Sequence, residues 1–403
     1  MKPVIILHHH EITLKGHNRK FFELQLLKNI RTALKEFPAV HRVFGGYGRS
    51  IVELSTDSNI DAICLALSRV FGLSNICAGV QVEQDLETFK TIALQLLQPL
   101  KFSTLKVDTR RSDKRFPMKS MEVNGEVGGH LCDHYKVRAN MANPDVTVFI
   151  EIADGTAFIY LSKMHGIGGL PVGVSGRVVS LISAGFDSPV ASWRMMKRGA
   201  TVVFVHFHSM PYTSQNALDQ VKQLVEILTK YQYRSKLYIV PFADVQNEIV
   251  LHAPPPLRIV LYRRMMIRLA EMVARKEKAE ALVTGEALGQ VASQTLRNIR
   301  VIDEAATFPI LRPLCGMDKE ETMDHARKIG THDISSEPFD DCCSFLAPRS
   351  PETWAQIEMV ENAETNYDIE AILKDTMGKI TIEDFHYPAV NDKEDEDTST
   401  PFL

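Results

Sequence analysis

A stretch of 22 residues, VVSLISAGFDSPVASWRMMKRG (178–199), restricts the folds open to this chain more than any other. The β-branched run VVSLIS is typical of a buried parallel strand, and a turn of small residues, SAGFDS, follows it. An amphipathic segment that is typical of a helix then begins at Pro189. A strand that passes through a tight turn into a helix is the repeating unit of an α/β sheet, so this region is predicted to be α/β.

The same alternation continues after this stretch. Strand-like runs TVVFVHF, KLYIVPF and ALVTG are separated by the helical patterns SQNALDQVKQLVEILTKY and PLRIVLYRRMMIRLAEMVARKEK. Strands and helices in this order predict a doubly wound parallel sheet. The preceding segment, HGIGGLPVGVSGR (165–177), has five glycines and no hydrophobic period, so we expect either a linker or a loop over an active site.

The chain of 403 residues is long enough for two or three domains. Residues 1–60 alternate strand, helix and strand, with a hairpin turn GGYG, which predicts a small ferredoxin-like α+β domain. A second helix, NIDAICLALSRVFG, is predicted to end at Gly72, and residues 73 to about 165 repeat the mixture and close with a hairpin around Asp154-Gly155, so the second domain is placed at 61–165. Residues 166–385 hold the predicted parallel sheet, and the acidic segment 386–403 is predicted to be a disordered tail.

The formal net charge of −4 argues against a wholly basic nucleic-acid binder but allows a local basic surface. Residues 106–120, KVDTRRSDKRFPMKS, hold six cations against two acids. Such a strip could bind RNA phosphates, which supply most nucleic-acid affinity, or it could be an ordinary solvated face. The predicted RNA-binding residues are Arg110, Arg111, Lys114, Arg115 and Lys119, with Lys15, Arg19 and Lys20 as a possible extension.

Membrane and secretory signals are missing from the sequence. No apolar run reaches 18 residues, and the N-terminal MKPVIILHHHE meets a Glu too early for a signal peptide, so we expect a cytoplasmic protein without a membrane partner. The three adjacent histidines at 8–10 could suggest a metal site. Alternation along a strand sends neighbouring side chains to opposite faces, so we interpret them as a strand end.

The turn SAGFDS has the composition of a phosphate cradle. Free N–H groups at the start of the following helix attract anions, Ser183 and Ser188 add hydroxyls, and Gly185 lets the backbone approach a phosphate. We expect Ser188 to cap the helix, with Pro189 at its first position. Asp187 would repel phosphate unless Mg²⁺ bridged them, which suggests a metal. The alternative is a serine-rich cap on an ordinary helix.

The turn differs from better-known phosphate loops, since it is neither a Walker A loop nor a dinucleotide fingerprint. It resembles the PP-loop, SGGxDS, of ATP pyrophosphatases, with Ala184 in place of the second residue. If that position needs a positive φ, the methyl group costs roughly 1 kcal/mol and could crowd a phosphate. If φ is negative, the change is nearly harmless, and we expect Ala184 to be tolerated.

The six cysteines form no CxxC pair, so a zinc ribbon is not expected. Cys64, Cys77, Cys132 and Cys315 are interpreted as core residues. The pair Cys342–Cys343 lies in a loop between Pro338 and Pro348, after two acids that would raise a thiol pKa. The sequence alone therefore does not mark either of these two thiols as preactivated.

Longer motifs resemble one family. ITLKGHNRKFFE, GIGGLPVGVSGRVVSLISAGFDSPVASW, VTGEALGQVASQT (283–295) and EPFDDCCSFLAPRSP (337–351) are similar, in this order, to the tRNA 4-thiouridine synthetase family, ThiI. The resemblance covers residues 1 to about 385. It implies that the three predicted domains are a ferredoxin-like domain (1–60), a THUMP RNA-binding domain (61–165) and a PP-loop domain (166–385).

The resemblance also implies site residues. Lys319 would neutralise phosphate charge, Asp187 would act with Mg²⁺, and Cys343 would form a disulfide with the sulfur carrier, with Cys342 as the alternative. Without the resemblance, Lys319 could be an ordinary helix residue, and Arg263 could belong to a solvated helix face with Arg258, Arg264 and Arg268. The implied ATP site comprises Leu181, Ile182, Ser183, Gly185, Ser188, His206, Phe207, Arg263, Gly285 and Gln294.

The implied reaction is conversion of uridine 8 of tRNA to 4-thiouridine: ATP adenylates the C4 oxygen, and persulfide sulfur then replaces it. The chain has no room for a rhodanese domain, so we expect a cysteine desulfurase or another persulfide carrier as partner, and the family suggests a homodimer. Two alternatives remain open. One is sulfur transfer to the thiazole of thiamin, and the other is an RNA-binding protein whose PP-loop is inactive, with Ala184 as the lesion.

Overall fold

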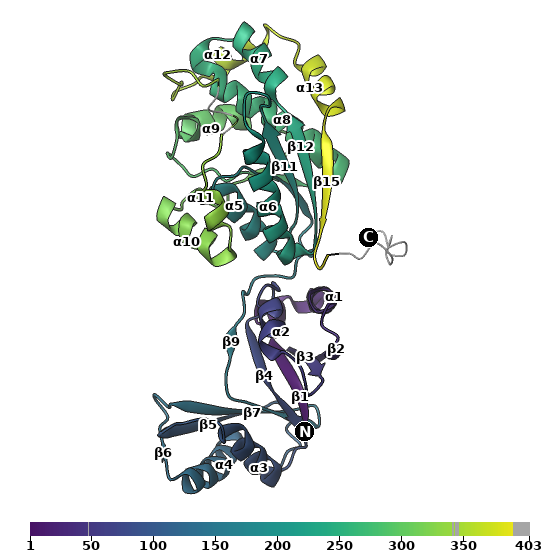
Figure 1. Ribbon diagram of the computed structural model, residues 1–403, viewed down its shortest axis with the longest axis vertical. Helices are drawn as coiled ribbons and strands as arrows, with labels where there is room; N and C mark the ends of the chain where they lie inside the picture. The colour runs from purple at the N-terminus through teal and green to yellow at the C-terminus, as the bar shows by residue number, and fades with distance from the viewer. Residues whose placement is uncertain (47, 341, 343–345, 390–403) are drawn as a thin grey trace. The chain divides into compact units, whose positions relative to one another are not determined.

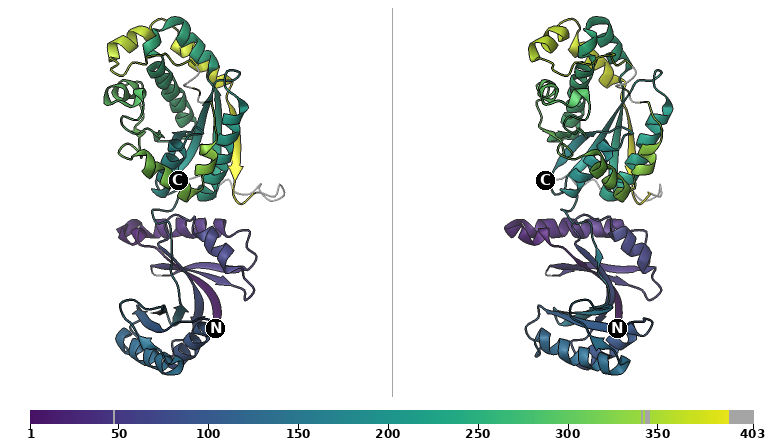
Figure 2. Two further views of the ribbon diagram at one scale, coloured as in Figure 1. Left: turned by 60° about the vertical axis from the view of Figure 1, so that its left-hand side comes forward. Right: turned by 90° about the vertical axis from the view of Figure 1, so that its left-hand side faces the viewer.

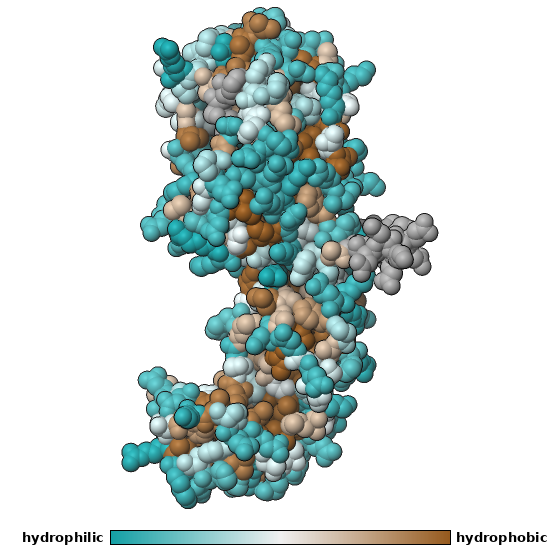
Figure 3. All heavy atoms as spheres, in the orientation of Figure 1, coloured by the Kyte–Doolittle hydropathy of each residue, from teal (hydrophilic) through white to brown (hydrophobic). Residues whose placement is uncertain are grey.

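The computed structural model describes residues 1–46, 48–340, 342 and 346–389. The chain divides into two compact units, the first from Met1 to Pro171 and the second from Val172 onward (Figure 1). On the face seen in Figure 3, hydrophilic residues cover most of the surface and apolar residues gather in separate patches. Among the described residues, no helix combines the length and apolar character needed to cross a bilayer.

The first unit is an α+β structure. Short 3₁₀ turns, Glu11–Leu14 and Gly16–Asn18, precede its first helix. Its strands and helices in chain order are β1 (Lys2–His8), α1 (Arg19–Ala33), β2 (Val40–Gly46), β3 (Arg49–Leu54), α2 (Ile60–Leu67), β4 (Asn75–Val82), α3 (Leu86–Leu97), β5 (Thr104–Arg111), α4 (Ser120–Tyr135), β6 (Arg138–Ala139), β7 (Val146–Ala153), β8 (Thr156–Tyr160) and β9 (Met164–His165).

The strands of the first unit form one sheet in the order β2-β3-β1-β4-β8-β7-β5-β6, with β9 beside β4. Strand β4 pairs antiparallel with both β1 and β8, so it joins the N-terminal strands to the later ones. Helices α3 and α4 pack on one face around a core that includes Phe89, Val107 and Val127. The predicted hairpin turn is confirmed, since Asp154 and Gly155 both have positive φ between β7 and β8.

The helix predicted to reach Gly72 ends earlier, at Leu67. Gly72 has φ +102° and donates its N–H to the Gly168 carbonyl, so it serves a contact with the glycine-rich segment rather than a helix stop. That segment is anchored at both ends: Gly168 also donates to the Leu73 carbonyl, and Gly173 donates to Gly199 in the second unit. The segment therefore connects the two units, as expected if it is a linker.

The second unit is the predicted α/β structure. Short 3₁₀ turns are Pro255–Leu257 and Ala292–Gln294. Its strands and helices are β10 (Arg177–Leu181), α5 (Asp187–Lys197), β11 (Thr201–His208), α6 (Gln215–Gln232), β12 (Arg234–Pro241), α7 (Ala243–His252), α8 (Arg258–Glu277), β13 (Ala281–Val283), α9 (Leu296–Asp303), β14 (Ile310–Leu311), α10 (Lys319–Ile329), α11 (His332–Ser336), α12 (Ile357–Glu364), α13 (Ile369–Gly378) and β15 (Thr381–His386).

The sheet of the second unit has the order β14-β13-β10-β11-β12-β15. Strands β10 to β14 are parallel, and β15 adds an antiparallel edge that the sequence patterns did not predict. Helices α5 and α6 cover one face, and α8 with its neighbours covers the other (Figures 1 and 2). The chain runs from β10 to β11 on one side and returns to β13 on the other, so a topological switch point lies at β10.

Candidate active site

A cavity of about 430 Å³ opens at the carboxyl ends of β10, β11 and β13. This is the edge at which doubly wound sheets bind ligands, and the volume suits a small organic ligand. Its walls come from the loop after β10, the end of β11, the loop after β13, helix α8, the start of α10 and the segment near residue 340. All ten predicted ATP-site residues line it: Leu181, Ile182, Ser183, Gly185, Ser188, His206, Phe207, Arg263, Gly285 and Gln294.

The loop between β10 and α5 is closed by its two serines. The Ser183 N–H donates to Ser188 Oγ at 2.8 Å, and the two hydroxyl oxygens lie 3.2 Å apart. The prediction that Ser188 caps the helix is wrong: α5 begins at Asp187, and Pro189 is its third residue. The Ser188 hydroxyl instead bends back to hold the loop, and the amino-terminal turn of α5 lies at the cavity, where its dipole favours an anion.

Asp187 and Lys319 meet across the cavity, from the first residues of α5 and α10. Lys319 Nζ lies 3.6 Å from Asp187 Oδ1, and Gln290 Nε2 donates to Asp187 Oδ2 at 3.2 Å. The start of α10 is fixed by a reciprocal capping box, in which Asp318 accepts from the Glu321 N–H and Glu321 accepts from the Asp318 N–H. The lysine is thus placed by its helix terminus and half exposed to the cavity.

Ala184 lies buried in the cavity wall, and its φ is not positive. The Ala184 side chain therefore causes no left-handed backbone strain. This is the case in which the replacement of glycine by alanine was expected to be nearly harmless. Gly185 is also outside the positive-φ region, and a Cβ there would meet only ordinary contacts at 3.7 Å. Neither position needs glycine for the loop's own conformation.

Replacing Ala184 with glycine should therefore bring no gain in activity. We expect a change in turnover of less than about twofold and a loss of about 0.4–1 kcal/mol in the free energy of unfolding, because glycine adds backbone freedom to the unfolded chain. Steady-state kinetics and urea unfolding of the Ala184→Gly variant would check both. A large increase in turnover would instead show that the methyl group obstructs the ligand.

His206 joins the end of β11 to the start of the loop that follows β10. Its Nδ1 lies 3.0 Å from the Ile182 carbonyl oxygen, and a carbonyl only accepts, so Nδ1 carries the proton of this bond. The ring is buried at the cavity wall with Phe207 next to it. Two strand ends are thereby held together beneath the site.

Helix α8 is a buried helix and not the solvated face considered as the alternative for Arg263. Arg264 is almost fully buried and forms a two-bond pair with Glu364, which Arg268 also contacts. These pairs fasten α12 to α8. Arg263, half-buried on the same helix, lines the cavity.

Of the cysteine pair, Cys342 is described and Cys343 lies outside the described residues. Cys342 is buried in the main apolar core, lines the cavity, and its carbonyl accepts from Gln246 Nε2 at 2.7 Å. Cys77 is buried as predicted, and burial raises its thiol pKa to about 12. Cys64, Cys132 and Cys315 are only partly buried, so none of them lies fully in the core, although Cys132 packs against the core of the first unit.

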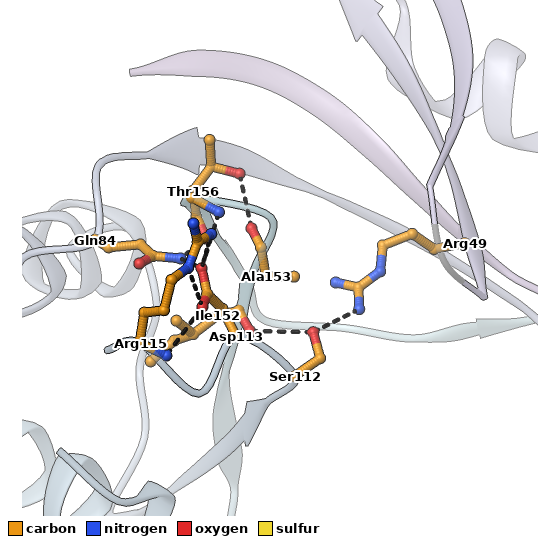
Figure 4. A network of polar contacts seen from close by, with 9 residues as sticks. Arg49, Gln84, Ser112, Asp113, Arg115, Ile152, Ala153 and Thr156 are labelled. Atoms are coloured by element: carbon orange, nitrogen blue, oxygen red, sulfur yellow. Dashed lines mark hydrogen bonds and ion pairs between the residues drawn. The ribbon is translucent and has the colours of Figure 1, made fainter. Parts of the chain in front are cut away.

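The basic segment 106–120 is organised around one carboxylate (Figure 4). Asp113 accepts from the Arg115 guanidinium at 2.8 and 2.9 Å, from Gln84 Nε2 at 3.3 Å and from the Gly155 N–H at 3.1 Å. Arg111 donates through Nη1 to two backbone carbonyls at 2.8 Å, so this cation holds the loop's shape. Arg110, Lys114, Arg115 and Lys119 are exposed.

The Asp113 contacts predict a pH-dependent contribution to stability. Hydrogen bonds from Arg115 lower the pKa of Asp113 well below its ordinary value of 3.8. A depressed carboxyl pKa stabilises the fold above the ordinary value, and the contribution is lost as pH falls through the lower, folded value. The stability advantage of wild type over Asp113→Asn should therefore be complete near neutrality and shrink below about pH 4.

Urea unfolding of both proteins at neutral and acidic pH would test this. Other carboxylates titrate equally in the two proteins and cancel in the difference, so a difference that stays constant down to pH 3 would contradict the assignment.

The sequence falls into three segments that match known family models. Residues 4–77 match the ThiI ferredoxin-like domain, residues 83–162 the THUMP domain, and residues 173–369 the model described as thiamine biosynthesis protein (ThiI). A Thermoanaerobacter pseudethanolicus protein named as a tRNA sulfurtransferase is 41% identical, covering 93% of this chain and 98% of the relative. The chain belongs to the ThiI family of tRNA sulfurtransferases. A Coxiella burnetii member is likewise 41% identical, over 94% of this chain and 98% of its own.

Solved structures agree with membership of the ThiI family. A 4-thiouridine synthetase crystallised with RNA and bound ATP has a TM-score of 0.88 and 33% identity, covering 96% of this chain and all of that one. PH1313 from Pyrococcus horikoshii, at 24% identity and a TM-score of 0.63, shares the fold. The predicted fold class of ferredoxin-like, THUMP and PP-loop domains is therefore confirmed.

A magnesium site in this ThiI family member would depend on Asp187. Within the described ranges, no group of three or more His, Cys, Asp or Glu could hold a metal. Mg²⁺ commonly binds one or two carboxylates together with substrate phosphates, and the Asp187 carboxylate would fit that pattern if the loop after β10 held the phosphates. The neighbouring Glu286 carboxylate is already engaged by Arg312.

A buried carboxylate after β13, which the sequence patterns did not single out, also lines the cavity. Glu286 lines the cavity and is buried; it accepts from Arg312 Nε at 2.7 Å and from Thr284 Oγ1 at 2.9 Å. Arg312 also contacts Asp303 at the end of α9. In the sequence, Glu286 directly follows Gly285, a predicted ATP-site residue. Only the fold shows that Glu286 pairs with Arg312, which lies 26 residues further along the chain.

Proposed function

We propose that this protein uses ATP to convert uridine 8 of tRNA into 4-thiouridine. One observation carries the proposal: the predicted ATP residues, together with Asp187 and Lys319, line a single cavity at the switch point of the sheet. The names of the relatives and the RNA and ATP bound by the similar structure support it. Because tRNA is the proposed substrate, we expect the enzyme to act in the cytoplasm.

The cavity supplies what adenylation requires. The uridine C4 oxygen attacks the α-phosphorus of ATP, pyrophosphate leaves, and sulfur then displaces AMP from C4. The first-turn N–H groups of α5 and the Ser183 hydroxyl would bind phosphate oxygens, and Lys319 would offset the charge that develops on the leaving pyrophosphate. Asp187 would orient Lys319 and hold Mg²⁺, which when bound would neutralise phosphate charge.

The sulfur step would use Cys343, with a cysteine desulfurase or another persulfide carrier as donor. Cys342 is buried among apolar side chains, which disfavours the thiolate, so we assign the reacting thiol to its neighbour. A homodimer in which one subunit holds tRNA for the other's site belongs to the same proposal.

The cysteine assignment predicts a split between the two half-reactions. Cys343→Ser should abolish 4-thiouridine formation while leaving tRNA-dependent ATP–pyrophosphate exchange within about twofold, because the thiol acts after adenylation. Cys342→Ser should retain both activities within a few-fold and lose stability. The reverse pattern would give the role to Cys342.

The function itself is tested by incubating the purified protein with unmodified tRNA, ATP, Mg²⁺ and a persulfide donor, and analysing the nucleosides by mass spectrometry. Formation of 4-thiouridine at position 8 is expected. Intact tRNA binding without pyrophosphate exchange would leave an RNA-binding protein with an inactive PP-loop.

A role in thiamin synthesis is the second candidate, favoured by the description of the family model that matches residues 173–369. A deletion strain that requires thiazole for growth, restored by the wild-type gene, would support it. Growth without thiazole would exclude an essential role.

A further inference from the structure

Exposed apolar side chains lie near Gln290, Val291 and Gln294, three residues of the loop after β13 that line the cavity. Leu288, Val291 and Leu296 are between 47% and 71% exposed, and Trp354 is 64% exposed. Val291 itself lines the cavity. We call Leu288, Val291, Leu296, Arg297 and Trp354 the rim surface. The adenylation and sulfur steps described above use none of these side chains.

The rim surface has a rigid base. Asn298 is fully buried and donates through Nδ2 to the carbonyls of Ala292 and Glu352, both at 2.7 Å, while its Oδ1 accepts from the Ala355 N–H at 3.0 Å. Thr295 Oγ1 donates to the Thr353 carbonyl at 2.9 Å. The backbone on both sides of Trp354 is thus tied to the loop that contributes Val291 and Gln294 to the cavity.

The chemistry of the rim surface suits a nucleobase. The Arg297 guanidinium lies 4.7 Å from the centre of the Trp354 ring. Both groups are flat, and both kinds of side chain stack on nucleobases. Arg300 lies three residues further along α9 and is exposed, as is Arg349 on the segment that leads to Trp354. Of the nearby acids, Asp303 pairs with Arg312 and Glu304, just after α9, pairs with Arg264, while the Glu352 carboxylate accepts from the Trp354 N–H at 2.8 Å. The three arginines thus offer positive charge for an RNA phosphate beside the ring.

We propose that Trp354 and Arg297 hold an unpaired nucleobase of the RNA substrate, next to the uridine that enters the cavity. This inference rests on the proposed function. A base that leaves its stack to reach an active site exposes the faces of its neighbours, and an aromatic side chain at the entrance can cover one of them. Base–aromatic stacking tolerates any base, so the contact would add affinity with little sequence preference.

The experiment measures equilibrium binding of an unmodified tRNA transcript by labelled-RNA anisotropy, without ATP or sulfur donor. Trp354→Ala should raise Kd by about 5- to 100-fold, because one stacked base is lost, while Trp354→Phe should stay within about threefold. Trp354 is largely exposed, so neither change should unfold the protein. Ile382→Ala, an exposed apolar residue on the edge strand β15, is the matched control and should leave Kd unchanged.

Fluorescence gives a second readout, because the chain has two tryptophans and Trp193 is buried. Adding tRNA should quench the wild-type signal, and the quench should disappear in Trp354→Phe although that variant still binds. Unchanged tRNA affinity in Trp354→Ala would overturn the proposal. The proposal would also be overturned if Trp354→Ala weakened binding of the sulfur-donor protein and left tRNA binding unchanged. That result would assign the rim surface to the donor protein.

The inference and the proposed function fail separately in this design. A protein that forms no 4-thiouridine but shows the tRNA-binding losses above would retain the nucleobase site and lose the proposed function. Normal 4-thiouridine formation together with unchanged tRNA affinity in Trp354→Ala would support the proposed function and refute the nucleobase site.

Discussion

Removing the charge of Lys319 is expected to lower the rate of adenylation by about 10²–10³-fold, the usual cost of losing one preorganised group that stabilises transition-state charge. The ammonium lies 3.6 Å from Asp187 Oδ1 at the first residue of α10, beside the phosphate loop. Lys319→Met keeps the apolar stem and removes only the charge. Pyrophosphate exchange with saturating tRNA would measure the rate, and the KM for ATP should change much less than kcat.

Lys328 provides the matched control, because it is an exposed lysine on the same helix and is not among the residues found at the cavity. Lys328→Met should exchange pyrophosphate at the wild-type rate. If Lys319→Met retained adenylation within about threefold, the lysine would be an ordinary helix residue and its proposed role would be lost.

Gly285→Ala is expected to damage both the fold and the nucleotide site. A Cβ at Gly285 would lie 2.7 Å from the Ser188 nitrogen and 2.8 Å from the Asp187 carbonyl carbon. Both are backbone atoms in the first turn of α5, so no side chain can rotate to make room for the added Cβ. We expect a loss of about 1–3 kcal/mol in the free energy of unfolding and at least about tenfold in ATP affinity, since α5 must shift.

Gly185→Ala separates the two effects. Its added Cβ meets only contacts at 3.7 Å, so unfolding should be unchanged, whereas ATP affinity should fall if a phosphate lies against this backbone. Urea unfolding, followed by the fluorescence of the buried Trp193, and ATP titrations of both variants would test the contrast. Wild-type stability in Gly285→Ala would mean that the loop after β13 and the start of α5 can move apart to admit the added Cβ.

Much of the fold followed from local patterns. The runs VVSLIS, TVVFVHF and KLYIVPF are β10, β11 and β12, because apolar β-branched runs of this length belong in buried parallel strands. The antiparallel strand β15 was not predicted, since TIEDFH (381–386) is half polar and is a strand only because it pairs with the edge of β12. Ser188 was misassigned as a cap because a serine beside Pro189 has the local composition of one.

The sequence by itself determined which residues could serve phosphate chemistry: small residues, serines and an aspartate between a strand and a helix. Tertiary structure alone decided the rest. It set φ at Ala184, brought the loop after β13 against the start of α5 so that only glycine fits at Gly285, paired Glu286 with Arg312, and tied Trp354 to the cavity loop through Asn298. The last three join segments distant in the chain, and local propensity cannot specify contacts that arise only when strands and helices pack.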